Sequence, residues 1–223
     1  MASEYLLNKP DGSSINIGSH YEQLDEAHLD INAWIGFLLD KGYKKIILQG
    51  HSLGTIKVIR YLFEGKYKSK INKLILLCPF DKTFLIEKFT TRKYIQYLKQ
   101  AKKKILEGKG DEIVPKNYGG FKLSYQTYLS WFDNNDLSHM FDLSIKNYKF
   151  PILNKINIPV HVIVGTNDEY FYQSDPKHPE IGFRILINNL KKGGGKLIKN
   201  ATHSFAGYEK TVALEVLKFA KSK

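Results

Sequence analysis

The chain lacks most of the features that mark membrane, secreted and metal-binding proteins. It has a single cysteine, Cys78, so no disulfide can form within it. No apolar run approaches the roughly 20 residues of a membrane-spanning helix, and residues 1–5 lack the basic and apolar regions of a secretory signal. No metal-ligand spacing such as His-Glu-x-x-His occurs. These absences argue against stable membrane insertion and predict a cytoplasmic protein without a metal.

Acidic residues are also scarce relative to basic ones: the chain has 34 Lys and Arg against 22 Asp and Glu, a net charge of +12. Such an excess suits nucleic acid, an anionic membrane or an acidic ligand. It is equally typical of the Lys-, Asn-, Ile- and Tyr-rich proteins of an AT-rich genome, which is the interpretation we prefer. No zinc-finger spacing or glycine-aromatic RNA-binding signature occurs, so the sequence predicts no nucleic-acid partner. The run Lys102-Lys103-Lys104 is the candidate for a basic binding surface, although charge runs on helices are usually only solvated.

Apolar residues alternate between helical and strand spacing along most of the chain. Helical spacing covers residues 21–41, 53–64 and 208–221, and buried strands are predicted at 45–49, 73–78, 160–164 and 196–199. The run Gly193-Gly194-Gly195 is expected to form the turn before the last strand. Strands that alternate with helices predict an α/β fold, with a mostly parallel sheet and helices on both faces. We expect one domain over residues 1–223.

Residues 81–150 interrupt this alternation. A helical segment near 84–106 is followed by a loop around Pro115 and by an aromatic-rich helical region. An insertion after the second predicted strand would form a helical lid over the carboxyl edge of the sheet, where ligands bind in open α/β sheets. Its aromatic residues suit either an acyl pocket or the small core of the lid itself.

The segment Gly50-His51-Ser52-Leu53-Gly54 lies between a predicted strand and a predicted helix. The Gly-x-Ser-x-Gly pattern arises by chance only about 0.07 times in a chain of this composition, and this setting is that of a nucleophile elbow. The serine would take a strained conformation at a sharp turn, with Gly50 and Gly54 where helix and strand backbones nearly touch. The helix N-terminus favours developing negative charge, and the Leu53 amide is a predicted oxyanion-hole donor.

A serine nucleophile needs a base and an acid that orients the base. Asp168 follows the third predicted strand and His203 follows the fourth, so both are expected at the same sheet edge as Ser52. Of the other histidines, His51 is expected to pack locally and His161 to lie in the core. The sequence leaves three alternatives for the acid: Glu169, Asp175 and Asp81.

Three segments together resemble the α/β-hydrolases of the serine esterase and lipase type. Residues 46–54 resemble their elbow, residues 157–168 their acid-bearing strand and loop, and residues 201–205 their histidine loop. The resemblance implies a triad of Ser52, Asp168 and His203 that hydrolyses a small-molecule carboxylic ester through an acyl-enzyme. It implies no metal or organic cofactor. Thioester or amide hydrolysis and acyl transfer remain alternatives.

The start of the chain departs from that family, whose members have several strands before the helix that leads to the elbow. A loop among those strands supplies a second oxyanion amide, often near a His-Gly pair. Only 43 residues precede Lys44, and no His-Gly pair occurs. We therefore expect an N-terminally shortened hydrolase, unless residues 1–20 replace the strands. The strand at 45–49 would have an open edge, which favours self-association or poor solubility unless residues 1–20 cover it. The alternative function is a weak or inactive hydrolase-fold relic or binding protein.

Overall fold

The computed structural model describes residues 5–79, 81–82, 84–85, 93–116, 118, 122–133, 140–143, 145, 147–171, 178 and 180–222. The chain divides into two compact units. The first unit comprises residues 1–27 and 85–138, and the second comprises residues 28–84 and 139–223. The expected insertion at 81–150 thus has narrower bounds here, and the N-terminal residues group with it. That the insertion covers the active site stays a prediction.

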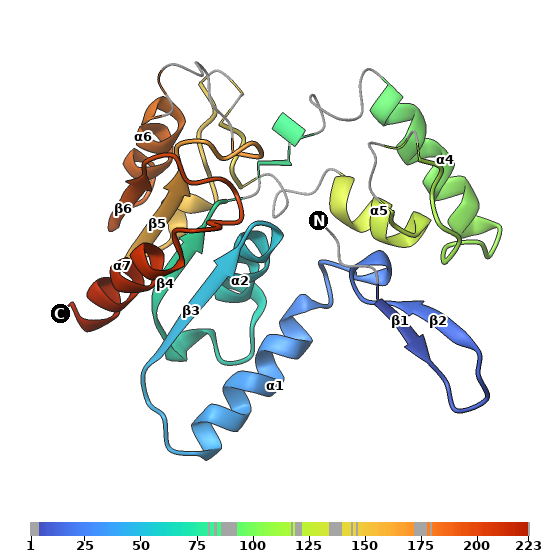
Figure 1. Ribbon diagram of the computed structural model, residues 1–223, viewed down its shortest axis with the longest axis horizontal. Helices are drawn as coiled ribbons and strands as arrows, with labels where there is room; N and C mark the ends of the chain where they lie inside the picture. The colour runs from blue at the N-terminus through green and yellow to red at the C-terminus, as the bar shows by residue number, and fades with distance from the viewer. Residues whose placement is uncertain are drawn as a thin grey trace. The chain divides into compact units, whose positions relative to one another are not determined.

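The second unit contains a parallel sheet of four strands (Figure 1). In spatial order these are β3 (Ile46–His51), β4 (Ile71–Leu77), β5 (Val160–Gly165) and β6 (Gly193–Ile198). Each neighbouring pair is parallel. All four carboxyl ends therefore lie at one edge of the sheet, and all four amino ends lie at the opposite edge.

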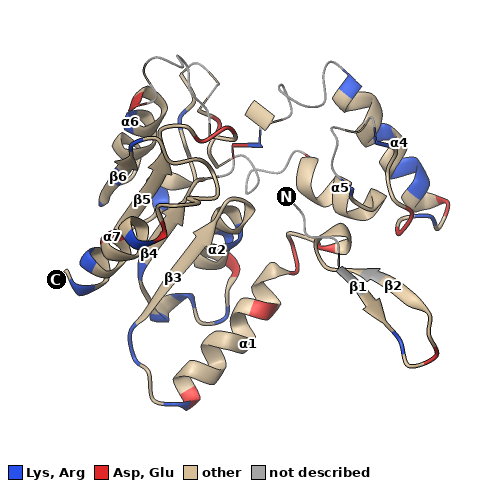
Figure 2. Ribbon diagram, in the orientation of Figure 1, with Lys and Arg blue, Asp and Glu red and all other residues tan. Residues whose placement is uncertain are grey.

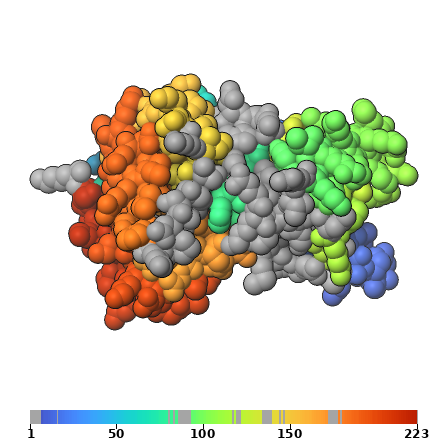
Figure 3. Space-filling view, turned by 90° about the horizontal axis from the view of Figure 1, so that it is seen from above, coloured from blue at the N-terminus to red at the C-terminus, as the bar shows by residue number. Residues whose placement is uncertain are grey.

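Helices cover both faces of this sheet, as the sequence predicts. They are α1 (Ala27–Asp40), α2 (Leu53–Glu64), α6 (Glu180–Asn188) and α7 (Glu209–Lys221), with single turns η2 (Lys68–Lys70) and η4 (Leu153–Lys155). On one face Ile75 and Ile163 pack with Val212 of α7. On the other face Ile46 packs with Ile35 of α1 and Tyr61 of α2. In Figure 3 the described residues after about 150, coloured yellow to red, lie side by side in this view.

The strand β3 has an open side. The Ile46 N–H donates to Asn72 Oδ1 and the Ser52 N–H donates to Leu77 O, both on the β4 side. Because backbone groups of successive strand residues point to opposite sides, those of Ile47, Gln49 and His51 point away from β4, where no strand of the described residues pairs with them. The predicted open edge is therefore present within the described part of the chain.

Three glycines expected to form a turn, Gly193-Gly194-Gly195, instead lie within β6 and pair with β5. This prediction was wrong because close packing, rather than a turn, requires the glycines. A Cβ on Gly195 would lie 2.3 Å from Val162 O and 2.8 Å from Phe183 Cζ on α6. Glycine thus allows β5 and α6 to approach β6 closely.

The first unit combines an N-terminal hairpin with two helices. Its elements are β1 (Tyr5–Asn8), β2 (Ser14–Ile17), η1 (Ser19–Tyr21), α4 (Tyr94–Leu106) and α5 (Tyr125–Phe132). The N-terminal residues are tied to the insertion because the Ser124 N–H donates to His20 O and the Leu24 N–H donates to Ser130 Oγ, both at 2.8 Å. Since β1 and β2 pair only with each other among the described strands, they do not replace a strand of the parallel sheet.

The basic run of α4 is matched by acidic partners. Lys102 lies 3.3 Å from Asp133, Lys103 lies 3.9 Å from Glu107, and Lys104 lies 3.3 Å from Glu112. These ion pairs reduce the positive potential of the surface that the sequence singled out. No helix in the described ranges is both long enough and apolar enough to cross a bilayer.

Candidate active site

Ser52 occupies a sharp turn between β3 and α2. Its φ of 54° and ψ of −124° are strained for a residue with a side chain. A Cβ on Gly50 would lie only 2.3 Å from Gly54 O, so strand and helix backbones nearly touch at this position. A Cβ on Gly54 would meet nothing within 4 Å. The geometry is that of a nucleophile elbow, but only the first of its two glycines is required by space.

Asp168 lies just beyond β5 and is almost fully buried, with 2% of its surface exposed. Its Oδ1 accepts hydrogen bonds from the Tyr170 N–H at 2.9 Å, the Phe171 N–H at 3.1 Å and His203 Nδ1 at 2.9 Å. Burial alone would raise the pKa of Asp168, but the hydrogen bond and charge of His203 and the backbone donor hold it below its usual value. The carboxylate is thus ionised and aimed at the His203 ring.

The loops that carry Asp168 and His203 are held together by backbone contacts. The Asn167 N–H donates to Ala201 O at 2.9 Å, and the Asn200 N–H donates to Thr166 Oγ1 at 2.8 Å. A Cβ on Gly165 would lie 2.1 Å from Ala201 O. The end of β5 therefore packs directly against the loop that carries His203, which fixes Asp168 relative to His203.

The alternative acids have other partners. Glu169 Oε2 accepts from the His203 backbone N–H at 3.3 Å, not from its ring. Asp81 accepts from the backbone N–H groups of Phe84 at 3.0 Å and Leu143 at 3.1 Å. Asp175 lies outside the described residues. Of the described carboxylates, Asp168 is the one bonded to the His203 ring.

His51, the variable residue of the elbow, contacts the histidine loop. Its Nε2 bonds His203 O at 2.8 Å, and the two rings are 4.9 Å apart. Partial desolvation, opposed in part by that hydrogen bond, lowers the pKa of His51 and favours its neutral ring. Because the carbonyl oxygen of His203 can only accept, Nε2 of His51 carries the donated proton. In the described residues, no hydrogen bond joins Ser52 Oγ to His203. Sequence reasoning placed His51 in local packing and could not foresee a partner 152 positions later.

Cys78 also lies beside Asp168. It follows β4, has a φ of 46°, is fully buried, and donates its N–H to Ile163 O at 2.8 Å. Burial and the charge of Asp168 strongly raise the pKa of the thiol. His51, Cys78 and His203 place ligand-type atoms within 4.8 Å of one another. Cys78 directly follows β4 as Ser52 directly follows β3, although the sequence analysis counted Cys78 within the predicted strand at 73–78.

One known protein family matches nearly the whole chain. Residues 2–219 match a family described as "Protein of unknown function (DUF1749)". The chain belongs to this family. No curated protein sequence matches the chain.

Solved structures similar to this DUF1749 protein are α/β-hydrolases. The monoacylglycerol lipase of Paleococcus ferrophilus is 21% identical, with a TM-score of 0.54 and coverage of 92% of this chain and 77% of the lipase. An esterase of Exiguobacterium antarcticum is 19% identical, with a TM-score of 0.52 and coverage of 95% and 78%. A bromoperoxidase of Bacillus anthracis is 18% identical, with a TM-score of 0.51 and coverage of 90% and 75%.

These neighbours show that the DUF1749 chain has the α/β-hydrolase fold, as the resemblance implied. At such identities they show the fold alone. The family match begins at residue 2, and the alignments run over nearly the whole chain. The alignments cover 77% of the lipase and 78% of the esterase, and the N-terminal shortening expected from the sequence stays a prediction.

Proposed function

We propose that this protein is a serine hydrolase that cleaves a carboxylic ester, with Ser52 as nucleophile, His203 as base and Asp168 as the orienting acid. The observation that carries the proposal is the 2.9 Å hydrogen bond between His203 Nδ1 and the buried Asp168 carboxylate. It lies at the sheet edge where Ser52 occupies a strained elbow. A buried carboxylate that fixes an imidazole near a strained serine is the arrangement that activates a hydroxyl nucleophile.

The proposed reaction proceeds in two halves. Because Nδ1–H of His203 is donated to Asp168, Nε2 holds the free lone pair and takes the proton of Ser52 Oγ as that oxygen attacks the ester carbonyl. The tetrahedral intermediate collapses when His203 returns the proton to the leaving alcohol. Water then attacks the acyl-enzyme, with His203 again as base, and releases the acid and Ser52. In enzymes without bound substrate, the contact between nucleophile and base is often long, and it shortens in the reactive complex. We expect a hydrogen bond between Ser52 Oγ and His203 Nε2 to form in the substrate complex.

Backbone groups at the start of α2 are the proposed oxyanion donors. Leu53 is the first residue of α2, and the first N–H groups of a helix have no acceptor within it. The positive end of the helix dipole adds to this stabilisation. Loss of one such donor lowers turnover by about 10²–10³-fold in serine hydrolases. We therefore expect the Leu53 N–H to contribute a similar factor to turnover.

Labelling with a fluorophosphonate probe tests the proposal, because the probe reacts with an activated serine. We expect the probe to label the wild-type protein and Ser69→Ala, a control in the exposed turn η2. Ser52→Ala should not react, and its hydrolysis of a soluble p-nitrophenyl ester should fall by about 10⁶-fold. Retained labelling of Ser52→Ala would identify another nucleophile.

A matched pair of acid variants tests the role of Asp168. Asp168→Asn should lower turnover by roughly 10⁴-fold, because an amide in its place favours the wrong histidine tautomer. Glu169→Gln should retain most activity, since its contact is to the His203 backbone. Equal losses would reject Asp168 as the acid. A folded wild-type protein that never reacts with the probe would favour the inactive binding protein.

A further inference from the structure

The sheet edge opposite Ser52 carries a dense group of lysines, which we call the lysine collar. These residues lie in the segments 40–46, 64–73, 155–160, 189–193 and 218–222, where strands of the second unit begin and helices end (Figure 2). Because the four strands are parallel, their amino ends meet at this one edge. The collar comprises Lys41, Lys44, Lys45, Lys66, Lys68, Lys70, Lys73, Lys155, Lys191, Lys192, Lys218 and Lys221.

Base composition does not account for this placement. The collar holds 12 of the 31 lysines of the chain, yet its five segments contain only 33 of the 223 residues. A genome-wide preference for lysine codons would spread these residues along the sequence. Helix-dipole stabilisation explains only Lys218 and Lys221, which lie in the last turn of α7, since α1, α2 and α6 have no basic residue in theirs.

The positive charge of the collar is not neutralised locally. Its segments contain two acidic residues, Asp40 and Glu64, and Glu64 already pairs with Arg60 at 3.1 Å. Within the described ranges, no collar lysine forms an ion pair with a carboxylate. Eleven of the twelve are exposed, and Lys73 instead donates to Phe219 O at 2.9 Å and Ser222 O at 2.6 Å at the end of α7. The run Lys102-Lys103-Lys104 of α4 differs in this respect, because each of these three lysines has an acidic partner.

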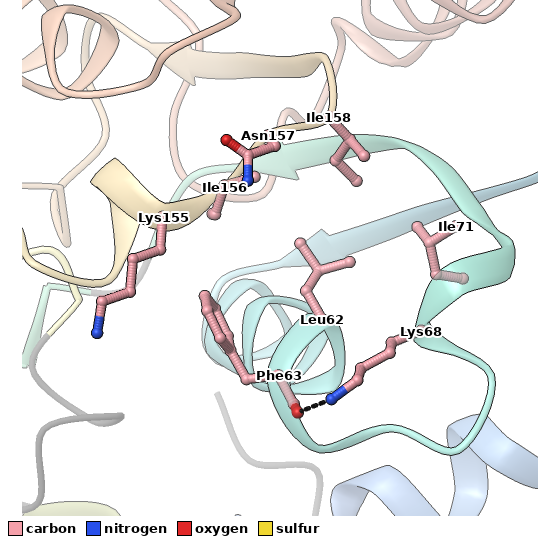
Figure 4. A pocket seen from close by; sticks show the side chains of 8 residues that line it. All are labelled: Leu62, Phe63, Lys68, Ile71, Lys155, Ile156, Asn157 and Ile158. Carbon is pink, nitrogen blue, oxygen red and sulfur yellow. Dashed lines mark hydrogen bonds between the residues drawn. The ribbon is translucent and has the colours of Figure 1, made fainter.

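An apolar recess opens within the collar. It has a volume of about 170 Å³, with an apolar floor and two lysines on its wall (Figure 4). Lys68 is held in place by donating to Phe63 O at 2.6 Å, as Figure 4 shows. Tyr43, which lies between Lys41 and Lys44 in the collar segment that precedes β3, is 60% exposed. The floor consists of Leu62, Phe63, Ile71, Ile156 and Ile158.

We propose that the lysine collar docks this protein on an anionic phospholipid surface. Unpaired lysines near such a surface each favour binding, and the attraction falls off within a Debye length. The recess and Tyr43 supply apolar and aromatic groups suited to the headgroup region. A nucleic-acid site would more often use arginine, whose planar fork matches phosphates and base edges, and the collar contains none.

Docking in this way has a consequence for the catalytic edge. Ser52 follows the carboxyl end of β3, whereas the collar surrounds the amino ends of the strands, so the sheet separates the two. A protein held by its collar presents the elbow away from the lipid surface. The membrane would therefore concentrate the protein at a surface without feeding its ester substrate from the bilayer. The docking proposal does not depend on the proposed catalysis.

Two triple variants with the same net charge provide the test. The collar variant is Lys44→Gln, Lys45→Gln and Lys70→Gln, in which Lys45 and Lys70 precede the paired strand residues Ile46 and Ile71. The control variant removes the ion-paired run: Lys102→Gln, Lys103→Gln and Lys104→Gln. Sedimentation with vesicles of phosphatidylcholine plus about 30% phosphatidylserine should show wild-type binding that weakens with salt. Vesicles of phosphatidylcholine alone should bind little.

The collar variant should lose about 100-fold in vesicle affinity, whereas the control variant should lose less than about 5-fold. Both variants should keep wild-type circular dichroism and wild-type hydrolysis of a soluble ester, which separates this test from that of the catalytic proposal. Equal losses in the two triples, or no preference for anionic vesicles, would overturn the proposal. It would also be overturned if a fluorescent oligonucleotide bound more tightly than the vesicles through the same lysines.

Discussion

The two glycines of the elbow are expected to respond in opposite ways to the same substitution. A Cβ at Gly50 would lie 2.3 Å from Gly54 O, 2.5 Å from Gly54 C and 2.8 Å from Thr55 N. All three atoms are backbone, so no side-chain rotation can relieve the clash. A Cβ at Gly54 would meet nothing within 4 Å, and Gly54 has no positive φ.

These contacts give the expected magnitudes. Overpacking a rigid site costs about 1–3 kcal/mol, and each kcal/mol lowers the melting temperature of a domain of this size by about 2–4 °C. Gly50→Ala should therefore melt roughly 2–12 °C below the wild type. Gly54→Ala lies in the first turn of α2, where alanine is favoured over glycine by up to about 1 kcal/mol. It should melt at or slightly above the wild-type temperature.

Thermal unfolding followed by circular dichroism measures both variants, and fluorophosphonate labelling reports the state of the elbow. Gly50→Ala should also lose labelling, because relief of the clash must move the Ser52 turn. If Gly54→Ala were destabilised as strongly as Gly50→Ala, the close approach of strand and helix would not be the reason for glycine at position 50.

Three other predictions concern the neighbours of Ser52. The Cys78 thiol, buried and with a raised pKa, should not react with a disulfide reagent near neutral pH until the protein is unfolded in guanidinium chloride; rapid reaction of the native protein would contradict its burial. The pKa of His51 is lower in the folded protein than in the unfolded chain, so the unfolded chain takes up a proton first as the pH falls below about 6.5. Acid should therefore destabilise the wild type more than His51→Gln. Equal slopes of melting temperature against pH for the two proteins would refute this. Gln49→Pro removes an N–H that points to the open side of β3, so it should reduce concentration-dependent association, measured by light scattering. Leu48→Pro removes an N–H on the β4 side instead, so it should disrupt pairing with β4 and unfold the protein.

The position of Ser52, Asp168 and His203 at the carboxyl edge of the sheet was predictable because local sequence patterns determine it. Ser52, Asp168 and His203 each come soon after a short apolar run, and parallel strands bring the residues after such runs to one edge. The bounds of α2 agree with the predicted helix at 53–64. The Gly-x-Ser-x-Gly pattern marks its start after Ser52, and a glycine at position 65 marks its end.

The grouping of the chain into two units was not predictable in the same way. It depends on contacts such as those from Ser124 to His20 and from Leu24 to Ser130, which join positions about a hundred residues apart. The hairpin strands β1 and β2 are each four residues long, too short for a clear alternating pattern. A helix was predicted from residue 21, whereas α1 begins at Ala27, because the residues before it belong to the first unit.

The environment of His203 also depends on the tertiary structure. His51 and Cys78 have no sequence feature that links them to each other or to residue 203. They meet because β3 and β4 are adjacent and end at the same level, with His51 paired to Leu77 in the sheet register. Periodicity identifies a strand but not its neighbour, so a buried thiol beside the acid could be found only after strand order was known.

The same topological rule applies at the opposite edge of the sheet. If residues that follow apolar runs converge at one edge, residues that precede them must converge at the other. The pairs Lys44-Lys45 and Lys191-Lys192 directly precede β3 and β6, and Lys70 precedes β4. The sequence analysis looked for consecutive basic residues and therefore chose Lys102-Lys103-Lys104. The charges of these three lysines are matched by nearby carboxylates. In a parallel sheet, the position of a charge relative to the strand starts therefore says more about a shared surface than the length of a charged run.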